Sequence, residues 1–209
     1  MKPADMKRFI IPVICIVLFS YCKKNSDVVN TAKDYLPLTV GTNWTYISDG
    51  NTYKLTVTNK DTVALTRTYK VLSNSNGPNQ YQAKAGNDYY RFATFQGFLP
   101  NGVEELYLKE DQNVNATWQF SVPITFSGFP INVTAKYTIT EKGITKVVQG
   151  KTYNDVFHIR QDFSSPIGNH GGGDHFYAKG VGLISSNLAI TLPGQNINNT
   201  TELVSYEIK

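Results

Sequence analysis

Apolar and polar residues alternate with a period of two over much of the chain after residue 35. The clearest stretch is 131–139, in which every second residue is apolar: Ile131, Val133, Ala135, Tyr137 and Ile139. Successive side chains of a strand point to opposite faces, so this pattern predicts a strand with one buried and one solvated face. Tyr53, Leu55 and Val57 alternate with polar residues in the same way.

Further strands are predicted by runs of β-branched and aromatic residues at 62–73, 80–85, 89–95, 103–109, 117–122, 144–149, 156–163, 174–179 and 202–208. Turn signals separate the runs, at 49–51, 59–61, 76–78, 86–88, 141–143 and 150–151. Short polar turns join only antiparallel neighbours. We therefore predict an all-β domain over residues 35–209, a single antiparallel meander of roughly ten or more strands curled into an open barrel or half-barrel, with a two-layer β-sandwich as the alternative.

Proline and glycine interrupt the middle of this meander. They predict one long connection over residues 96–101 and another over 123–130. Pro130 has no N–H to donate to a ladder, so we expect it at a sheet edge or at the start of a strand.

The start of the chain has a different pattern. Lys7 and Arg8 precede an apolar run, residues 9–21, that stops at Cys22. A membrane-spanning helix needs about 20 apolar residues to cross roughly 30 Å of hydrocarbon, and this run is shorter. The layout therefore predicts a secretory signal peptide over residues 1–21 rather than an anchor helix.

The end of the apolar run, Leu18-Phe19-Ser20-Tyr21-Cys22, resembles the lipobox of bacterial lipoprotein precursors. Tyr21 departs from the small residues usual before the cysteine, and such relaxed boxes are typical of Bacteroidota lipoproteins. The resemblance implies acyl chains such as palmitate on Cys22, followed by a flexible tether to residue 34, and several acyl chains hold a protein on a bilayer. In Bacteroidota lipoproteins, acidic residues just after the lipidated cysteine are associated with export to the cell surface. Here two lysines follow Cys22 instead, so we expect the protein on the periplasmic face of the outer membrane.

Composition narrows the chemistry. The two cysteines, Cys15 and Cys22, both lie in the first 22 residues, so the domain has no disulfide, no thiol nucleophile and no cysteine zinc site. The formal net charge of the whole chain is only +4. No basic run with interleaved aromatic residues occurs, and we expect no nucleic-acid partner.

Trp44 is predicted to close one end of the core, and its N–H is expected to donate a hydrogen bond to a backbone oxygen. Gly180 and Gly182 are predicted to form a bulge or tight corner. The segments around them read YLPLTVGTNWTY (35–46) and FYAKGVGLI (176–184). In this order they resemble uncharacterised secreted proteins, often Bacteroidota lipoproteins, with an "lplkvGnsWtY" opening and a "YyakGvGlv" strand. The resemblance implies an open half-barrel similar in architecture to the carriers of the Lol system, and it implies no reaction.

One dense cluster of metal-capable residues is His170, Asp174 and His175. Two imidazoles and a carboxylate could hold a metal ion, so a metal-assisted hydrolase is the alternative function. Three glycines, 171–173, separate these residues and favour a mobile connection between strands instead. We assign no cofactor.

His158, Arg160 and Asp162 share one face of a predicted strand. Such a row resembles a general base with an orienting carboxylate, but it is more often a solvated sheet face, which is our prediction. No catalytic triad or nucleophile elbow can be assembled, so we assign no catalytic residue.

Aromatic residues provide the remaining candidate surface: Tyr89, Tyr90, Phe92, Phe95, Phe98 and Trp118. Tyr89 and Tyr90 are adjacent and should point to opposite faces of their strand. Most of these rings are expected in the core, and any exposed ones would bind an apolar molecule or an envelope protein. The leading hypothesis is therefore a non-enzymatic, membrane-anchored binding or accessory module.

Overall fold

The computed structural model describes residues 34–95, 99–126, 129–192 and 195–209. The predicted signal peptide, Cys22 and nearly all of the predicted tether lie outside these ranges. The described strands are β1 (Asn43–Ser48), β2 (Asn51–Ala64), β3 (Arg67–Asn74), β4 (Gln80–Ala85), β5 (Asp88–Phe95), β6 (Leu99–Lys109), β7 (Thr117–Phe126), β8 (Phe129–Val148), β9 (Lys151–Ser165), β10 (Gly168–Ala178), β11 (Gly182–Leu192) and β12 (Gln195–Glu207). Within the described part, no helix has the length and apolar content needed to span a bilayer.

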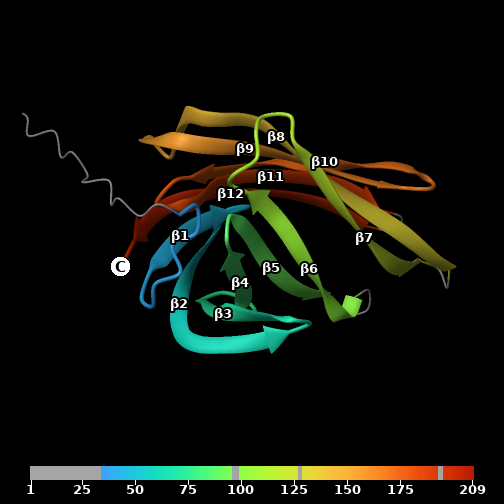
Figure 1. Ribbon diagram of the computed structural model, residues 1–209, viewed down its shortest axis with the longest axis horizontal. Helices are drawn as coiled ribbons and strands as arrows, with labels where there is room; N and C mark the ends of the chain where they lie inside the picture. Colours follow the sequence, from blue (N-terminus) through green and yellow to red (C-terminus); the bar gives the residue numbers. More distant parts are fainter. Residues whose placement is uncertain (1–33, 96–98, 127–128, 193–194) are drawn as a thin grey trace, which may run out of the picture.

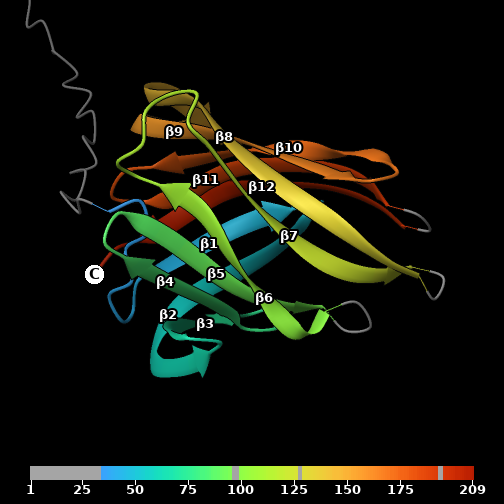
Figure 2. The same cartoon turned by 45° about the vertical axis from the view of Figure 1, so that its right-hand side comes forward.

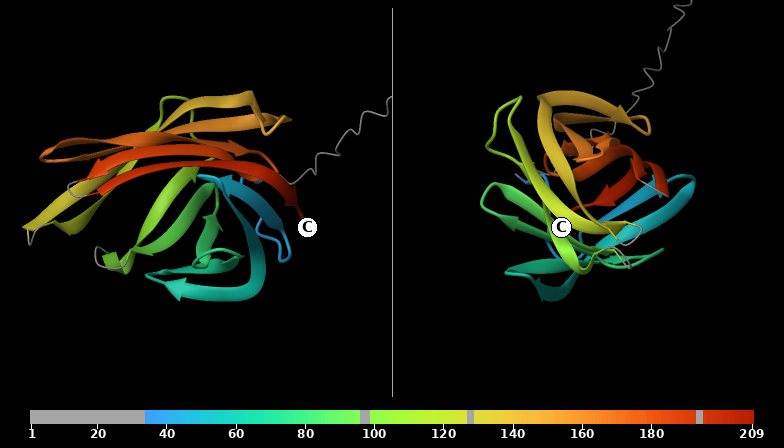
Figure 3. Two further views of the ribbon diagram at one scale, coloured as in Figure 1. Left: turned by 180° about the vertical axis from the view of Figure 1, so that it is seen from behind. Right: turned by 90° about the vertical axis from the view of Figure 1, so that its right-hand side faces the viewer.

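All the strands belong to one antiparallel sheet. Its order is β6-β5-β4-β3-β2-β1-β12-β11-β10-β9-β8-β7, so the first and last strands pair in the middle. The sheet curls into a nearly closed barrel whose edge strands, β6 and β7, leave a seam without backbone pairing (Figures 1 and 2). Figure 3 shows the same curl from behind and from the side. The predicted all-β meander and open barrel are confirmed, and the two-layer sandwich is wrong.

The alternation predicted for residues 131–139 sets the two faces of β8. Val133, Ala135, Tyr137 and Ile139 are buried, whereas Lys136 is exposed. The apolar face therefore points into the barrel, as the period of two requires.

Two of the predicted turns are wrong. Residues 59–61 lie inside β2, and residues 141–143 lie inside β8. In both places the pairing register slips, between Val57 and Asp61 in β2 and at several points around the second site in β8. Extra residues in one strand of a pair bend that strand and increase its twist, so a polar stretch that looks like a turn can continue a strand.

The predicted mobile connection around the three glycines is also wrong, because these glycines lie in β10 and pair with β9 and β11. Neighbouring backbone approaches them closely. A Cβ atom on Gly171, Gly172 or Gly173 would lie 2.1–2.2 Å from a carbonyl oxygen of an adjacent strand. The glycines are needed for close strand approach rather than for flexibility.

Most of the predicted connection 123–130 is likewise strand, shared between β7 and β8. Pro123 lies in β7, an edge strand, and Pro130 is the second residue of β8, as expected for residues that cannot donate to a ladder. Of the other predicted connection, 96–101, residues 96–98 lie outside the described ranges and Leu99 begins β6.

The two glycines and the tryptophan of the sequence pattern meet at one corner. Trp44 is 2% exposed, and its Nε1–H donates to the carbonyl oxygen of Val181 (2.6 Å). Gly180 and Gly182 flank Val181 with φ values of 74° and 107° where β10 turns into β11. Both predictions are confirmed, since the left-handed backbone conformation favours glycine.

The segment before β1 packs into the barrel. Tyr35 and Leu36 are buried, and the Tyr35 N–H donates to the hydroxyl of Tyr89 (3.1 Å). The Tyr35 ring lies edge-on against Phe157 with centroids 4.6 Å apart, and its hydroxyl donates to Asp155 (2.9 Å). The chain therefore leads from residue 34 directly into the core.

Candidate functional site

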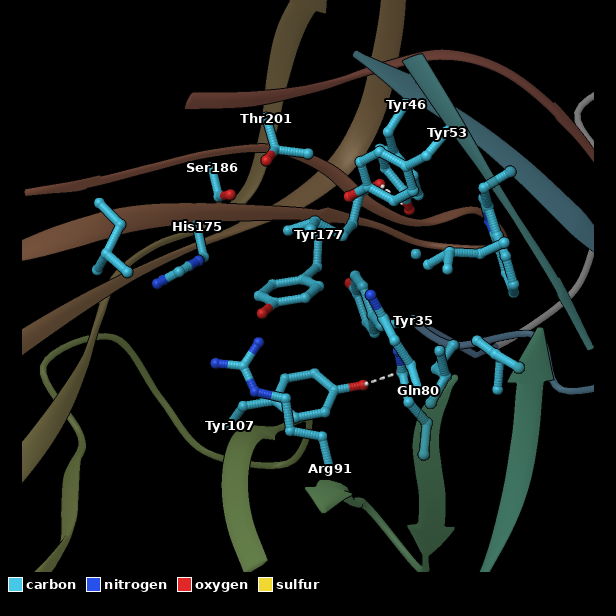
Figure 4. A pocket seen from close by; sticks show the side chains of 18 of the residues that line it. Tyr35, Tyr46, Tyr53, Gln80, Arg91, Tyr107, His175, Tyr177, Ser186 and Thr201 are labelled. Atoms are coloured by element: carbon cyan, nitrogen blue, oxygen red, sulfur yellow. Dashed lines mark hydrogen bonds between the residues drawn. The ribbon is translucent and has the colours of Figure 1, made fainter. Parts of the chain in front are cut away.

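The barrel contains a partly open cavity of about 220 Å³. Its wall is mixed. Several lining residues belong to one apolar core cluster: Trp44, Tyr46, Leu55 and Leu72. Figure 4 shows a second group, Arg91, Tyr107, His175 and Tyr177, around the same cavity. The cavity can therefore contact both an apolar and a polar part of one small molecule.

Glu105 of β6 is the centre of a hydrogen-bond network inside the barrel, and only 9% of its side chain is exposed. Its carboxylate accepts two hydrogen bonds from Arg91 of β5, of which that from Nη2 is 2.7 Å long. It also accepts from the Tyr137 hydroxyl of β8 and from Nε2 of Gln161 of β9 (3.4 Å). Nε2–H of His175 in β10 donates to Gln161 Oε1 (2.9 Å). The network thus links β5 and β6 to β8, β9 and β10.

The network fixes two protonation states. Burial raises the pKa of the Glu105 carboxyl, but the charge and hydrogen bonds of Arg91 outweigh burial, so this pKa is lowered and the group is ionised. Burial, and after it the positive charge of Arg91, lower the pKa of His175 from 6.5 to about 4. At neutral pH the network therefore combines the carboxylate of Glu105, the guanidinium of Arg91 and the neutral imidazole of His175.

Side chains bridge the seam between β6 and β7. Nε1–H of Trp118 in β7 donates to the backbone oxygen of Leu106 in β6 (2.7 Å). The Trp118 ring stacks on Tyr137, with centroids 5.5 Å apart and planes at 8°. The seam thus has a side-chain hydrogen bond in place of a backbone ladder, and the ring stack holds Trp118 against its neighbour in the paired strand β8.

The aromatic residues predicted to form a binding surface lie in different parts of the structure. Tyr89 is buried inside the barrel, whereas Tyr90 lies under the guanidinium of Arg67, 3.5 Å from its ring centroid. The Phe92 ring packs near Tyr69, with centroids 5.8 Å apart. The prediction that Tyr89 and Tyr90 face opposite ways is confirmed.

Trp118 lies at the seam, and the side chain of Phe95 and all of Phe98 lie outside the described part of the structure. Tyr89, Tyr90, Phe92 and Trp118 are not among the residues that line the 220 Å³ cavity. The structure therefore does not gather these aromatic residues into one binding surface, and other rings line the cavity.

The predicted metal ligands are not brought together. His175 bonds to Gln161 inside the barrel, whereas Asp174 bonds to His158 on the outside (2.9 Å). His170 contacts Ser165 (2.7 Å) near the start of β10. Among residues 34–95, 99–126, 129–192 and 195–209, no three His, Cys, Asp or Glu side chains form a group that could hold a metal ion. Consecutive residues of a strand point to opposite faces, which separates Asp174 from His175.

The row of His158, Arg160 and Asp162 lies on the outer face of β9. Arg160 donates to Asp162 (2.9 Å) and to Asp174 (3.1 Å), and His158 contacts both Asp174 and Glu141 (2.8 Å). These side chains are partly exposed, so the predicted solvated face is confirmed.

No protein-family model and no curated protein matches the sequence. Two solved structures are similar. A "putative lipoprotein" from Parabacteroides distasonis ATCC 8503 has a TM-score of 0.49 at 13% identity, covering 85% of this chain and 100% of that chain. A "putative exported protein" with a YmcC-like fold from Bacteroides fragilis NCTC 9343 has a TM-score of 0.40 at 9% identity, covering 82% and 98%. Likenesses of this size identify neither a family nor an activity.

Sequence reasoning missed Arg91, Glu105 and Gln161. A signal was present, since Gln161 follows Ile159 and Glu105 precedes Tyr107 at a spacing of two, on faces that are otherwise apolar. A polar residue in step with buried neighbours marks a buried network, because it must find partners there.

Proposed function

We propose that this protein is a lipoprotein of the bacterial cell envelope, anchored through acyl chains on Cys22, whose barrel binds a small molecule without catalysing a reaction. The observation that carries the binding role is the mixed cavity of about 220 Å³ inside the barrel. A cavity of roughly 150 Å³ already accepts benzene, so this one has room for a small ligand. The sequence predicts a purely apolar ligand. Because Arg91 and His175 also line the cavity, we propose a ligand that has a polar part as well.

The anchoring role is supported by the sequence alone. Lys7, Arg8, the apolar run and Cys22 have the order of a lipoprotein precursor. The tether would place the barrel close to the membrane, on the periplasmic face of the outer membrane. The metal-assisted hydrolase has no such support, because Asp174 and His175 lie on opposite faces of β10 and His170 bonds to Ser165 near the start of that strand.

The binding role is tested by mass spectrometry of small molecules that co-purify with the full chain. Ser186 lines the cavity, and a Ser186→Phe variant should fill part of it. Ser185, the neighbour on the opposite face of β11, provides a matched Ser185→Phe control. A molecule retained by wild type and by the control but lost from Ser186→Phe supports the proposal. Equal retention in all three proteins would remove it.

The anchor is tested by a Cys22→Ala variant. We expect this variant to leave the membrane fraction, since a single residue carries all the acyl chains. Metabolic labelling with a palmitate analogue should mark wild type and leave the variant unmarked. A variant that stays in the membrane fraction, together with unlabelled wild type, would contradict lipidation.

A further inference from the structure

Arg91 presents unused hydrogen-bond donors to the cavity. Its side chain is 42% exposed although it points into the barrel, whereas its partner Glu105 is 9% exposed. Nε and Nη2 donate to Glu105, and the described residues give Nη1 no acceptor. A guanidinium has five N–H groups in a planar fork, so one side of the fork holds Glu105 and the end formed by Nη1 and Nη2 can hold a second planar acceptor.

Two further polar groups lie beside this free edge. Figure 4 shows the hydroxyl of Tyr177 directed toward the Arg91 guanidinium, with His175 nearby. The described residues give the Tyr177 hydroxyl no hydrogen-bond partner, and its ring stacks on Tyr107 with centroids 5.4 Å apart. The position facing Arg91 therefore combines a cationic fork with a hydroxyl donor.

Arg91 also stands between two hollows. A second hollow of about 450 Å³ lies along β4 and β5, and Gln80, Gln82 and Arg91 line both it and the cavity. Leu55 and Leu72, in contrast, line only the cavity. The polar position is thus the one shared with the second hollow, and the aliphatic wall belongs to the cavity alone.

We propose that the cavity takes a small amphiphilic carboxylate, whose carboxylate lies on the free edge of Arg91 and the Tyr177 hydroxyl while its apolar part lies against Leu55 and Leu72. This inference rests on the proposed binding function and names its ligand class. Scaling from benzene in about 150 Å³, a 220 Å³ cavity has room for about nine non-hydrogen atoms. Hexanoate and benzoate have this size.

The charge of Glu105 does not exclude a second carboxylate. Glu105 is already saturated by Arg91, Tyr137 and Gln161, which spread its charge over several donors. A bidentate pair with Arg91 gives a bound carboxylate two charge-assisted hydrogen bonds. An alcohol of the same length would use only one acceptor atom, and an ammonium would face a guanidinium of the same sign.

The experiment compares three probes of equal chain length, hexanoate, hexan-1-ol and hexylammonium, in NMR titrations of the purified full chain. We expect hexanoate to bind at least about tenfold more tightly than hexan-1-ol, because one charge-assisted hydrogen bond is worth that factor or more. Shift changes should fall on residues around Tyr177 and Leu55. Hexylammonium should bind most weakly.

Two variants locate the carboxylate. Tyr177→Phe keeps the ring and should lose about tenfold for hexanoate and nothing for hexan-1-ol. An Arg91→Met, Glu105→Gln double variant removes both charges together, so that neither is left unpaired, and should abolish the preference for hexanoate. Tyr90→Phe, on the outer face, is the matched control and should bind all three probes as wild type does.

The outcomes separate the two proposals. Wild type that binds hexan-1-ol in the cavity as tightly as hexanoate would overturn the carboxylate assignment and leave the binding function in place. Tighter binding of hexylammonium would overturn the assignment and identify Glu105 as the recognition group. Absence of shift changes with all three probes would overturn both proposals.

Discussion

The two faces of β9 and β10 both carry polar side chains, but those on the outer face are exposed to solvent and those on the inner face are buried. On the outer face, Arg160 and His158 pair with carboxylates whose side chains are 27–51% exposed. On the inner face of the same strands, Gln161 and His175 are 3% and 8% exposed and join the network of Glu105. Adjacent residues of one strand are therefore all polar, yet one is exposed to solvent and the next is buried.

This difference decides which polar groups matter for the fold. Exposed ion pairs contribute about 0–1 kcal/mol, because water and salt screen them. A buried charge that loses its partner costs about 3–5 kcal/mol, because nothing compensates its desolvation. The outer face is richer in charge, but we expect the inner face to control stability.

The largest effect should come from Glu105→Leu. The change removes an acceptor from the buried Tyr137 hydroxyl and the Gln161 amide, and it leaves the partly exposed guanidinium of Arg91 without its anion, so together we expect a loss of about 3–5 kcal/mol in the free energy of unfolding. Urea denaturation followed by tryptophan fluorescence measures it. The Arg91→Met, Glu105→Gln double variant should lose less than the single variant, and a loss below about 1 kcal/mol for Glu105→Leu would refute the central role of this carboxylate.

The second effect is a dependence of stability on pH. The pKa of His175 is 6.5 in the unfolded chain and about 4 in the barrel, so between these values the unfolded chain binds the proton and the folded chain does not. Stability should therefore fall as pH drops from 6.5 toward 4, by up to about 3 kcal/mol. His175→Gln should flatten this slope in urea unfolding series between pH 7 and 4.5. An unchanged slope would show that another group causes it.

A smaller effect is expected at the seam. Trp118→Phe keeps a ring against Tyr137 but removes the hydrogen bond to Leu106, for a loss of about 1 kcal/mol. Hydrogen exchange should become faster in β6 and β7 than in β1 and β12, which are fully paired. Uniform acceleration along all these strands would argue that the seam is not a separate weak point.

The smallest effect is expected on the outer face. Asp162→Leu removes one exposed partner of Arg160, which keeps Asp174, and should change the free energy of unfolding by no more than about 1 kcal/mol. The same urea series measures it. A loss as large as that of Glu105→Leu would remove the contrast between the two faces.

Local pattern predicted much of the fold. The alternation at 131–139 identified a strand and its buried face, and Trp44 was assigned to the core with a backbone partner for its N–H. These predictions succeeded because strand periodicity and aromatic burial depend on near neighbours in the sequence. Residues 59–61 and 171–173 were misassigned because a bulge and a close strand approach depend on the neighbouring strand.

The candidate site could be predicted only in part. His175 was singled out from its sequence neighbours, but as a metal ligand beside Asp174, whereas the strand places the two on opposite faces. Arg91 and Glu105 are 14 residues apart and become partners because β5 and β6 pair in one register. The residues next to Arg91 and Glu105 in the sequence do not predict that register.

By itself, the sequence determined the strand class, the burial of Trp44 and the absence of disulfides from the domain, because each follows from composition or from a period of two. Only the tertiary structure decided that β1 pairs with β12, and that β6 and β7 are not paired with each other. That closure carries Glu105 to Tyr137 and Gln161 across the seam and forms the cavity beside Arg91. Such contacts join residues far apart in the chain, so they depend on how the whole sheet curls.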